Sequence, residues 1–478
     1  MRWFAPEIPK TSKSSLRLSS VVVGGIVTTS IVTAVMIAAA LTLPLPSAVA
    51  KTTITVYLRE SIPVEYEWEK RVIADFEKKN PDIDVQIVTE AGSTYDAKLL
   101  TLWATGNPPD VWDHGGTVNT YFYNDWLLDL GPYVRRDAAE INAADFFPAA
   151  WRAYRDGDKQ WGMPFVSVGS FMWYNTDLLD AAGLQSPAAD WNDTGWTWQR
   201  VQDYARKLTT YKPNGPIERA GLVIIHWSYL DIQYSWSFGG DWFDETAWRQ
   251  GVPSRPTFDT PANREAYQTM VDMLYRQRVA ITFENTTTDY ASNLYPTKQF
   301  TGGNAAMAVG EGPWLVMGQL DGIKFRWGMA PFPRGGQTKN YTSMVYTDPW
   351  MISSKAKNPE AAWKFVKYIT SAEVMKDYVK IGNFAPARKS AVLDYVNRLS
   401  QASRHHSAAE VLLALAGSQE YGREALDHVI VGWSDFFQEI QGRMPAIWGN
   451  TRAVPVVLKE IDEAVTRLIQ RKFPTGSR

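Results

Sequence analysis

Alternating strand and helix patterns after residue 51 constrain the fold more than any other feature of this chain. Between residues 52 and 58, apolar side chains occupy every second position, which is typical of a half-buried strand. A helical pattern follows, with Val72, Ile73 and Phe76 on one face, and alternation returns at residues 83–87. This order of elements predicts a βαβ unit, and therefore a parallel sheet.

The pattern continues in the next segment. A second helix is expected from Ala97 to Thr105, because Gly106 and two prolines end it, and Asp110 to Trp112 predicts a short strand end. We expect a doubly wound α/β domain, and such domains bind ligands beyond the carboxyl ends of their strands.

Helix start signals recur later in the chain. Thr197 is a predicted N-cap, Thr260-Pro261 and Asn358-Pro359 each predict a helix start, and Thr370 with Glu373 matches a capping box. Residues 391–478 are expected to be mostly helical. With 478 residues, the chain is long enough for two or three domains.

Composition excludes several classes of function. The chain has no cysteine, which rules out disulfides, thiolate metal sites, cysteine nucleophiles and a lipid-modified cysteine. Its formal net charge of −2 gives no reason to expect nucleic-acid binding. His405 and His406 are adjacent, so we expect a solvated helix surface there and no metal site. No cofactor is expected.

The first 50 residues have the layout of an export signal. Residues 21–43 carry no charge, Lys10, Lys13 and Arg17 precede them, and Ala48-Val49-Ala50 follows. We expect cleavage before Lys51. The alternative is an uncleaved membrane anchor, since the apolar stretch is long enough to span a bilayer. Either route places the rest of the chain outside the cytoplasm.

Clusters that combine tryptophan with short polar residues and glycine are the most distinctive chemical feature. Aromatic residues make up 13% of the chain, with 21 tryptophans. The clusters are 112–116, 226–229, 236–240, 310–314, 348–350 and 446–448. Sugar recognition needs this combination, because a pyranose offers an apolar face for stacking and a rim of hydroxyls for hydrogen bonds. Core packing is the alternative for any single tryptophan.

Most enzyme motifs are absent, including phosphate-binding glycine loops, the His-Glu-x-x-His zinc motif and the Gly-x-Ser-x-Gly elbow. A glycosidase pair of acids leaves no fixed spacing, so a secreted glycoside-active enzyme that uses Asp113 and Glu311 remains an alternative. A surface adhesion module, with the tryptophans forming a protein interface, is a third hypothesis.

Seven segments, in order, resemble the extracellular solute-binding proteins of carbohydrate ABC importers, the maltose- and glycerol-phosphate-binding-protein-like family. The matching segments are Ala74–Pro81, Tyr95–Val111, Gly162–Leu179, Phe300–Trp314, Pro331–Pro333, Asn358–Phe365 and Phe384–Arg388. The resemblance covers essentially all of residues 51–478.

The resemblance implies a type II periplasmic-binding-protein-like α/β fold, with two lobes, interleaved chain segments, a hinge and a ligand cleft between the lobes. One lobe would hold residues 51–165 and 330–390, and the other would hold 166–329 and 391–478. Closure around a ligand would draw on differential affinity for the closed state.

The resemblance also implies a function and a site. The chain would be a monomeric, non-enzymatic protein that captures a mono- or oligosaccharide and delivers it to ABC permease subunits in the membrane. The implied ligand-binding residues are Tyr95, Trp112, Asp113, His114, Trp227, Tyr229, Glu311, Trp314, Trp350, Arg388 and Trp448. The role of the Trp236–Trp248 segment stays open.

Overall fold

The computed structural model describes residues 51–474, apart from 61–62, 93, 114–117, 194, 227, 283–296, 313–321, 336–337, 339–340 and 382–383. Residues 51–478 form one compact unit. The predicted export segment at residues 1–50 lies outside the described residues.

The first sheet contains the predicted βαβ unit. Its strands run in the order β15-β14-β3-β1-β2, with β6 also paired to β14. β1 and β2 are parallel, with Thr52 opposite Ile83, so the predicted strand–helix–strand unit is confirmed. The strands are β1 (Thr52–Arg59), β2 (Ile83–Glu90), β3 (Val111–Asp113), β6 (Met163–Gly169), β14 (Ser343–Ile352) and β15 (Gly422–Glu424).

The second sheet is built from the middle of the chain, in the order β11-β10-β12-β7-β13. β10 is parallel to both β11 and β12, whereas β7 is antiparallel to its neighbours β12 and β13. The strands are β7 (Phe171–Asn175), β10 (Leu222–Ile224), β11 (Ala280–Thr282), β12 (Met307–Glu311) and β13 (Trp327–Ala330). Two short hairpins accompany the sheets, namely β4–β5 (Arg155–Asp156, Lys159–Gln160) and β8–β9 (Thr210–Tyr211, Ile217–Arg219).

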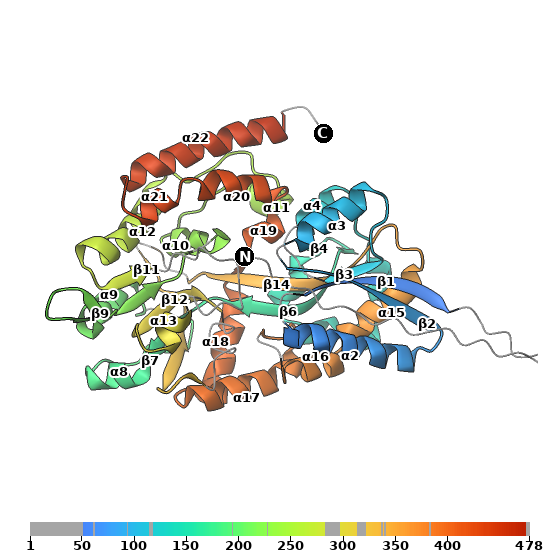
Figure 1. Ribbon diagram of the computed structural model, residues 1–478, viewed down its shortest axis with the longest axis horizontal. Helices are drawn as coiled ribbons and strands as arrows, with labels where there is room; N and C mark the ends of the chain where they lie inside the picture. The colour runs from blue at the N-terminus through green and yellow to red at the C-terminus, as the bar shows by residue number, and fades with distance from the viewer. Residues whose placement is uncertain are drawn as a thin grey trace, which may run out of the picture. The chain divides into compact units, whose positions relative to one another are not determined.

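The chain passes between the two sheets at two places in its strand sequence. Only Ser170 separates β6 of the first sheet from β7 of the second, and the chain returns between Ala330 and Ser343. In Figure 1, β6 and β14 run side by side across the middle of the molecule, in agreement with their antiparallel pairing. These two connections are the points at which consecutive strands change from one sheet to the other. The predicted division of the chain into two lobes stays a prediction.

Helices cover the sheets and dominate the last part of the chain, as predicted. In the first half they are α2 (Pro63–Lys79), α3 (Tyr95–Ala104), α4 (Val118–Tyr123), α5 (Gly131–Arg136), α6 (Ala138–Ile141), α7 (Pro148–Ala153), α8 (Thr176–Ala181) and α9 (Trp198–Leu208). The middle helices are α10 (Ile232–Ser237), α11 (Glu245–Gln250), α12 (Pro261–Val271) and α13 (Thr297–Thr301). The later helices are α15 (Pro359–Ile369), α16 (Ala372–Tyr378), α17 (Val392–Ser403), α18 (Ala408–Glu420), α19 (Leu426–Val429), α20 (Trp433–Gln441), α21 (Pro445–Trp448) and α22 (Val454–Lys472).

Side-chain caps explain several helix starts. Thr197 accepts a hydrogen bond from the backbone N–H of Arg200, and Thr260 caps α12 in the same way, as predicted. The predicted capping box at Thr370 is wrong by one residue, because Ser371 caps α16. The Thr370 hydroxyl instead donates to the carbonyl of Val366, at the end of the preceding helix.

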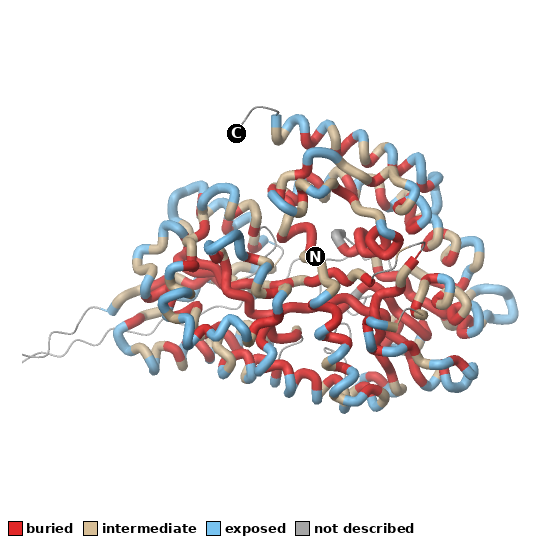
Figure 2. The backbone as a smooth tube through the Cα atoms, turned by 180° about the vertical axis from the view of Figure 1, so that it is seen from behind, coloured by how far each residue is buried: buried red, intermediate tan, exposed pale blue. Residues whose placement is uncertain are grey.

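Burial follows the strands. β6 and β7 are buried along their whole length, and exposed residues gather on the outer faces of the helices (Figure 2). Strands covered by helices on both faces lose the alternating pattern of a half-buried strand. Among the described residues, no helix combines the length and the hydropathy needed for a membrane span.

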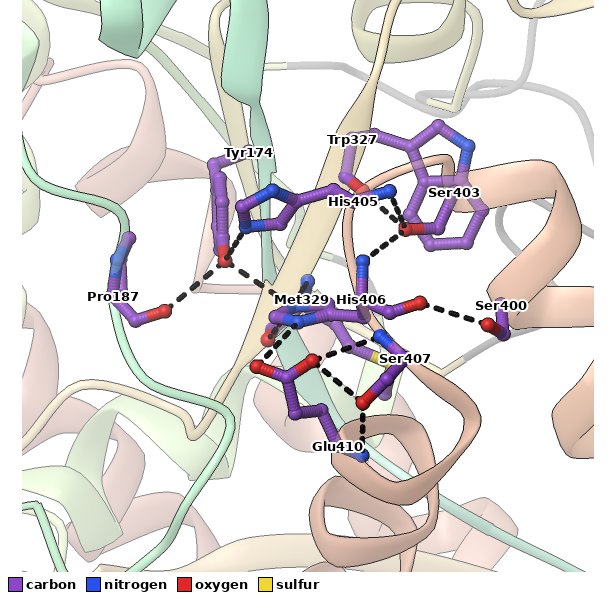
Figure 3. Close-up of polar contacts among 10 residues, drawn as sticks. All are labelled: Tyr174, Pro187, Trp327, Met329, Ser400, Ser403, His405, His406, Ser407 and Glu410. Carbon is purple, nitrogen blue, oxygen red and sulfur yellow. Dashed lines mark hydrogen bonds and ion pairs between the residues drawn. The ribbon is translucent and has the colours of Figure 1, made fainter.

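The turn between α17 and α18 packs against the edge of the second sheet (Figure 3). Nε2 of His406 lies 3.0 Å from both the N and the O of Met329 on β13, and 3.2 Å from the hydroxyl of Tyr174. Nε2 of His405 lies 3.3 Å from the same hydroxyl. His406 is 5% exposed, so the predicted solvated surface is wrong for this residue, and its ring satisfies backbone groups at an edge strand.

Candidate functional site

The carboxyl ends of β1 and β3 meet at one edge of the first sheet, because the two strands are parallel neighbours. β1 ends at Arg59 and β3 ends at Asp113. β14 runs antiparallel to β3 and places Trp350 opposite Asp113. This edge therefore gathers charged and aromatic residues from three strands.

Tyr95 holds Asp113 at this edge. Its hydroxyl lies 2.9 Å from the carbonyl oxygen of Asp113 and 3.2 Å from the carboxylate Oδ1. The ring of Tyr95 stacks on Tyr57 at 4.6 Å, which fixes its orientation from β1. The structure thus brings together two of the predicted site residues, and the partly exposed Asp113 carboxylate is positioned by a buried tyrosine.

Two acids of α2 lie near Asp113, and the sequence analysis did not single them out. Glu65 and Glu69 are one helical turn apart on the same face. Burial raises the pKa of Glu65 to about 7, with further contributions from the charges of Asp348 and Asp113. Burial, together with the charges of Asp113 and Glu65, also raises the pKa of Glu69 well above its ordinary value. The signal that could have found them is a pair of acids four residues apart at the start of the helix that follows β1.

The second sheet has an equivalent edge. β10 and β12 are parallel, so the residues that follow β10 lie beside the end of β12 at Glu311. His226 follows β10, and its ring stacks on Trp448 at 4.3 Å with an angle of 19°. Burial lowers the pKa of His226 to about 4, so the ring is neutral at physiological pH.

Trp448 is fixed at this second edge by polar contacts. Its indole Nε1 donates to Oδ2 of Asp231 at 2.9 Å, and Tyr275 donates to its backbone carbonyl at 2.6 Å. The hydroxyl of Tyr267 donates to the carbonyl of Asp231 at 3.0 Å. Trp448 is 4% exposed, and His226 covers one face of its ring. His226 is therefore a residue that the predicted site lacked.

Two predicted tryptophans pack within the first sheet's core. Trp112 makes edge contacts with Trp103 and Tyr121, with centroids 6.1 and 5.6 Å away. Trp350 meets the ring of Phe365 edge-on at 5.6 Å. Trp112 is 0% exposed and Trp350 is 1% exposed, so neither indole offers a free face in this structure. Their predicted ligand contacts stay predictions.

Arg388 is similarly engaged inside the protein. Its guanidinium donates to the carbonyls of Thr370 and Ile141 at 2.8 and 3.0 Å, and pairs with Asp145 at 3.2 Å. It also lies 3.9 Å from the centroid of Phe146. The side chain is 3% exposed, and these contacts connect the ends of α6 and α15 to the loop before α17. Its predicted contact with ligand likewise stays a prediction.

The remaining predicted site residues have no described side chains. His114, Trp227 and Trp314 lie outside the described residues, and for Tyr229 and Glu311 the structure describes the backbone alone. Tyr229 lies in a short 3-10 turn after β10, and Glu311 is the last residue of β12. Their positions in the chain place them near the edge of the second sheet.

The tryptophan-rich segment at 236–248 surrounds an arginine. Trp236 and Trp248 contact each other at 5.6 Å, and the guanidinium of Arg423 lies 4.5 and 4.1 Å from their centroids. Arg423 also pairs with Asp241 at 2.7 Å. Because Arg423 belongs to β15, this cluster connects the first sheet to helices beside the second. Within the described residues, no group of His, Asp and Glu side chains could hold a metal ion.

Comparison with known proteins agrees with this geometry. The model of the family described as bacterial extracellular solute-binding protein matches residues 61–376, which is more than half of the chain. The fold is that of the ABC substrate-binding protein Lmo0181 from Listeria monocytogenes in complex with cycloalternan, with a TM-score of 0.68, 22% identity, and coverage of 88% of this chain and 99% of that chain. The predicted type II periplasmic-binding-protein-like fold is therefore confirmed.

Two curated proteins are similar in sequence. The putative ABC transporter periplasmic-binding protein YcjN of Escherichia coli is 25% identical over 332 residues, which cover 67% of this chain and 70% of YcjN. The maltotriose-binding protein of Pyrococcus abyssi is 23% identical over 405 residues, which cover 82% of this chain and 74% of that protein. The chain belongs to the family of bacterial extracellular solute-binding proteins. The predicted family is confirmed.

Proposed function

We propose that this protein captures a mono- or oligosaccharide outside the cytoplasm and delivers it, chemically unchanged, to the permease of an ABC importer. The observation that carries the proposal is the Tyr95–Asp113 pair at the carboxyl ends of the parallel strands, where α/β sheets bind ligands. The similar maltotriose-binding protein and the cycloalternan complex support a carbohydrate as the ligand class.

The ligand-binding residues remain part of this proposal. Asp113 would accept hydrogen bonds from sugar hydroxyls, and Tyr95 would hold its carboxylate in place. On the second sheet, His226 would offer the less buried ring of the stacked pair that it forms with Trp448. Trp112, Trp350 and Arg388 would support the site through packing, and the side chains that are not described would complete it.

Calorimetric titration with a panel of mono- and oligosaccharides tests the proposal. Asp113→Asn should weaken the affinity for the bound sugar roughly ten- to a hundredfold, as expected for a hydrogen bond to a charged group. Glu218→Gln, at an exposed acid of the β8–β9 hairpin, should leave the affinity unchanged. The absence of a saturable response to any carbohydrate would refute the proposal.

A secreted glycoside-active enzyme that uses Asp113 and Glu311 is the alternative. Product analysis after long incubation with the bound oligosaccharide separates the two functions, because a binding protein returns its ligand intact. Turnover that is lost in Asp113→Asn would favour the enzyme.

We also propose export through the segment at residues 1–50. Mass determination of the protein recovered from the producing cell distinguishes the two routes that the sequence allows. A chain that begins at Lys51 indicates a cleaved signal, and a chain that retains residues 21–43 indicates an anchor.

A further inference from the structure

A pocket outside the strand-end edges lies among α7, the start of α17 and the end of α18. Its volume is about 540 Å³, and its lining includes Phe147 and Arg152 from the α7 region, Leu393 of α17, and Leu412, Gln419 and Glu420 of α18. This volume falls within the range of small-molecule sites, roughly 300–1,000 Å³. None of the predicted sugar-binding residues contributes to it.

Most of the residues that line the pocket are apolar. Phe147 is 7% exposed, whereas Leu393 is 57% exposed although it belongs to a helix whose opposite face is core. An apolar partner that enters the pocket would remove the side chain of Leu393 from water. Burial of apolar surface is favourable by roughly 25 cal/mol per Å².

The polar groups of the pocket favour an anion. The guanidinium of Arg152 is exposed and has no hydrogen bond or ion pair within the described part of the chain. Lys389 also borders the pocket and donates to the carbonyl of Ala144 at 2.9 Å. Against these two cations stands one acid, Glu420, so the lining carries a formal charge of +1.

A largely buried residue, Gln419, also lines the pocket. Gln419 is 4% exposed, and its Oε1 accepts a hydrogen bond from the hydroxyl of Ser167 on β6 at 2.9 Å. Its Nε2 donates to no other described residue, so the amide N–H groups are available to an acceptor in the pocket.

From this combination we propose that the pocket binds a small amphiphilic anion, namely a carboxylate on a medium-length aliphatic chain. The aliphatic chain contacts Phe147, Leu393 and Leu412, and the carboxylate is met by Arg152 and by the amide of Gln419. The proposal does not depend on the sugar-binding function, because the two sites share no residue.

The pocket is partly formed by a helix that contacts both sheets. Helix α18 packs against β6, β14 and β15 of the first sheet and against β13 of the second. The hydroxyl of Ser167, which bonds to Gln419, lies 3.2 Å from the hydroxyl of Thr347 on β14. A ligand on Gln419 therefore contacts the helix that both sheets share.

Calorimetric titration of the full chain with octanoate tests the proposal, with octanol as the uncharged probe. We expect saturable binding of one octanoate per chain and roughly tenfold weaker binding of octanol, since octanol lacks the charge that Arg152 recognises. Arg152→Gln should weaken octanoate binding by about the same factor and leave octanol binding unchanged.

A matched pair of leucines provides the control. Leu393→Glu places a like charge in the pocket and should abolish octanoate binding, whereas Leu413→Glu, on α18 at 55% exposure and outside the pocket lining, should leave it unchanged. The proposal is overturned if octanoate shows no saturable binding, or if both glutamate variants bind it as the parent protein does. Sugar titrations of Leu393→Glu should match the parent, so failure of this site is distinguishable from failure of the proposed function.

Discussion

Acid should destabilise this protein in part through one buried histidine at the turn between α17 and α18. His406 is 5% exposed, and its Nε2 lies 3.0 Å from the backbone N and O of Met329 (Figure 3). Burial and the charge of the neighbouring His405 together lower the pKa of His406 to about 4, against the opposing charge of Glu410. Protonation would remove the acceptor that meets the N–H of Met329.

Proton linkage gives the direction in which stability changes with pH. In the unfolded chain a histidine titrates near pH 6.5, so between about pH 4 and 6.5 the unfolded state binds more protons at His406 than the folded state does. The stability contributed by neutral His406 is therefore present above pH 6.5 and is lost as the pH falls. For these two pKa values, the free energy of unfolding falls by about 2 kcal/mol between pH 7 and pH 5.

Denaturant titrations at pH 7 and pH 5 measure this loss, and His406→Gln isolates it. The glutamine can still accept from the N–H of Met329 but does not titrate. We expect the variant to be less stable at pH 7 and to lose about 2 kcal/mol less than the parent on acidification. His226 and His405, whose pKa values are also lowered, titrate in both proteins and cancel in the comparison. An equal acid loss in parent and variant would refute the reasoning.

Three further changes test the fold. Trp350→Ala should lower the free energy of unfolding by about 3–5 kcal/mol in denaturant titrations, because the buried ring packs against Phe365. A variant that stays stable but binds sugar more weakly would instead indicate that Trp350 contacts the ligand. Gly221→Ala should lower the free energy of unfolding by about 1–3 kcal/mol, since the added Cβ would clash with the backbone of Ala205. An unchanged melting temperature would contradict this packing. Burial alone would lower the pKa of His428, but the charges of Asp427 and Glu424 raise it to about 9. Its contribution, on the order of 3 kcal/mol, is therefore present below pH 6.5 and lost as the pH rises through about 9, and His428→Gln should lack this alkaline loss in denaturant titrations.

Helices and strands were predicted well where a local sequence pattern, such as alternation or a capping hydroxyl, determines them. The alternation at residues 52–58 and 83–87 produced two parallel strands, and the hydroxyls of Thr197 and Thr260 cap their helices. At Thr370 the same logic chose the wrong residue, because Ser371 is adjacent and equally able to cap.

The site was harder to predict, because the residue types there do not reveal their surroundings. Trp112 follows Val111 in a strand that is covered on both faces, so alternation cannot tell whether its ring meets the core or a ligand. The carbonyls that accept hydrogen bonds from Arg388 come from other parts of the chain, so no local sequence pattern predicts these contacts. Glu65 and Glu69 became candidates only when the packing of α2 placed them near Asp113.

The order of strands in the first sheet also governs how the protein can mature. β14 and β15 complete this sheet, but they lie at residues 343–352 and 422–424, whereas β1 and β2 are among the earliest segments. Pairings between such distant segments form slowly, because the entropy lost on closing a long loop must be overcome before the strands gain any contacts. A chain emerging from the ribosome therefore cannot finish its first sheet until residues 422–424 have been synthesised.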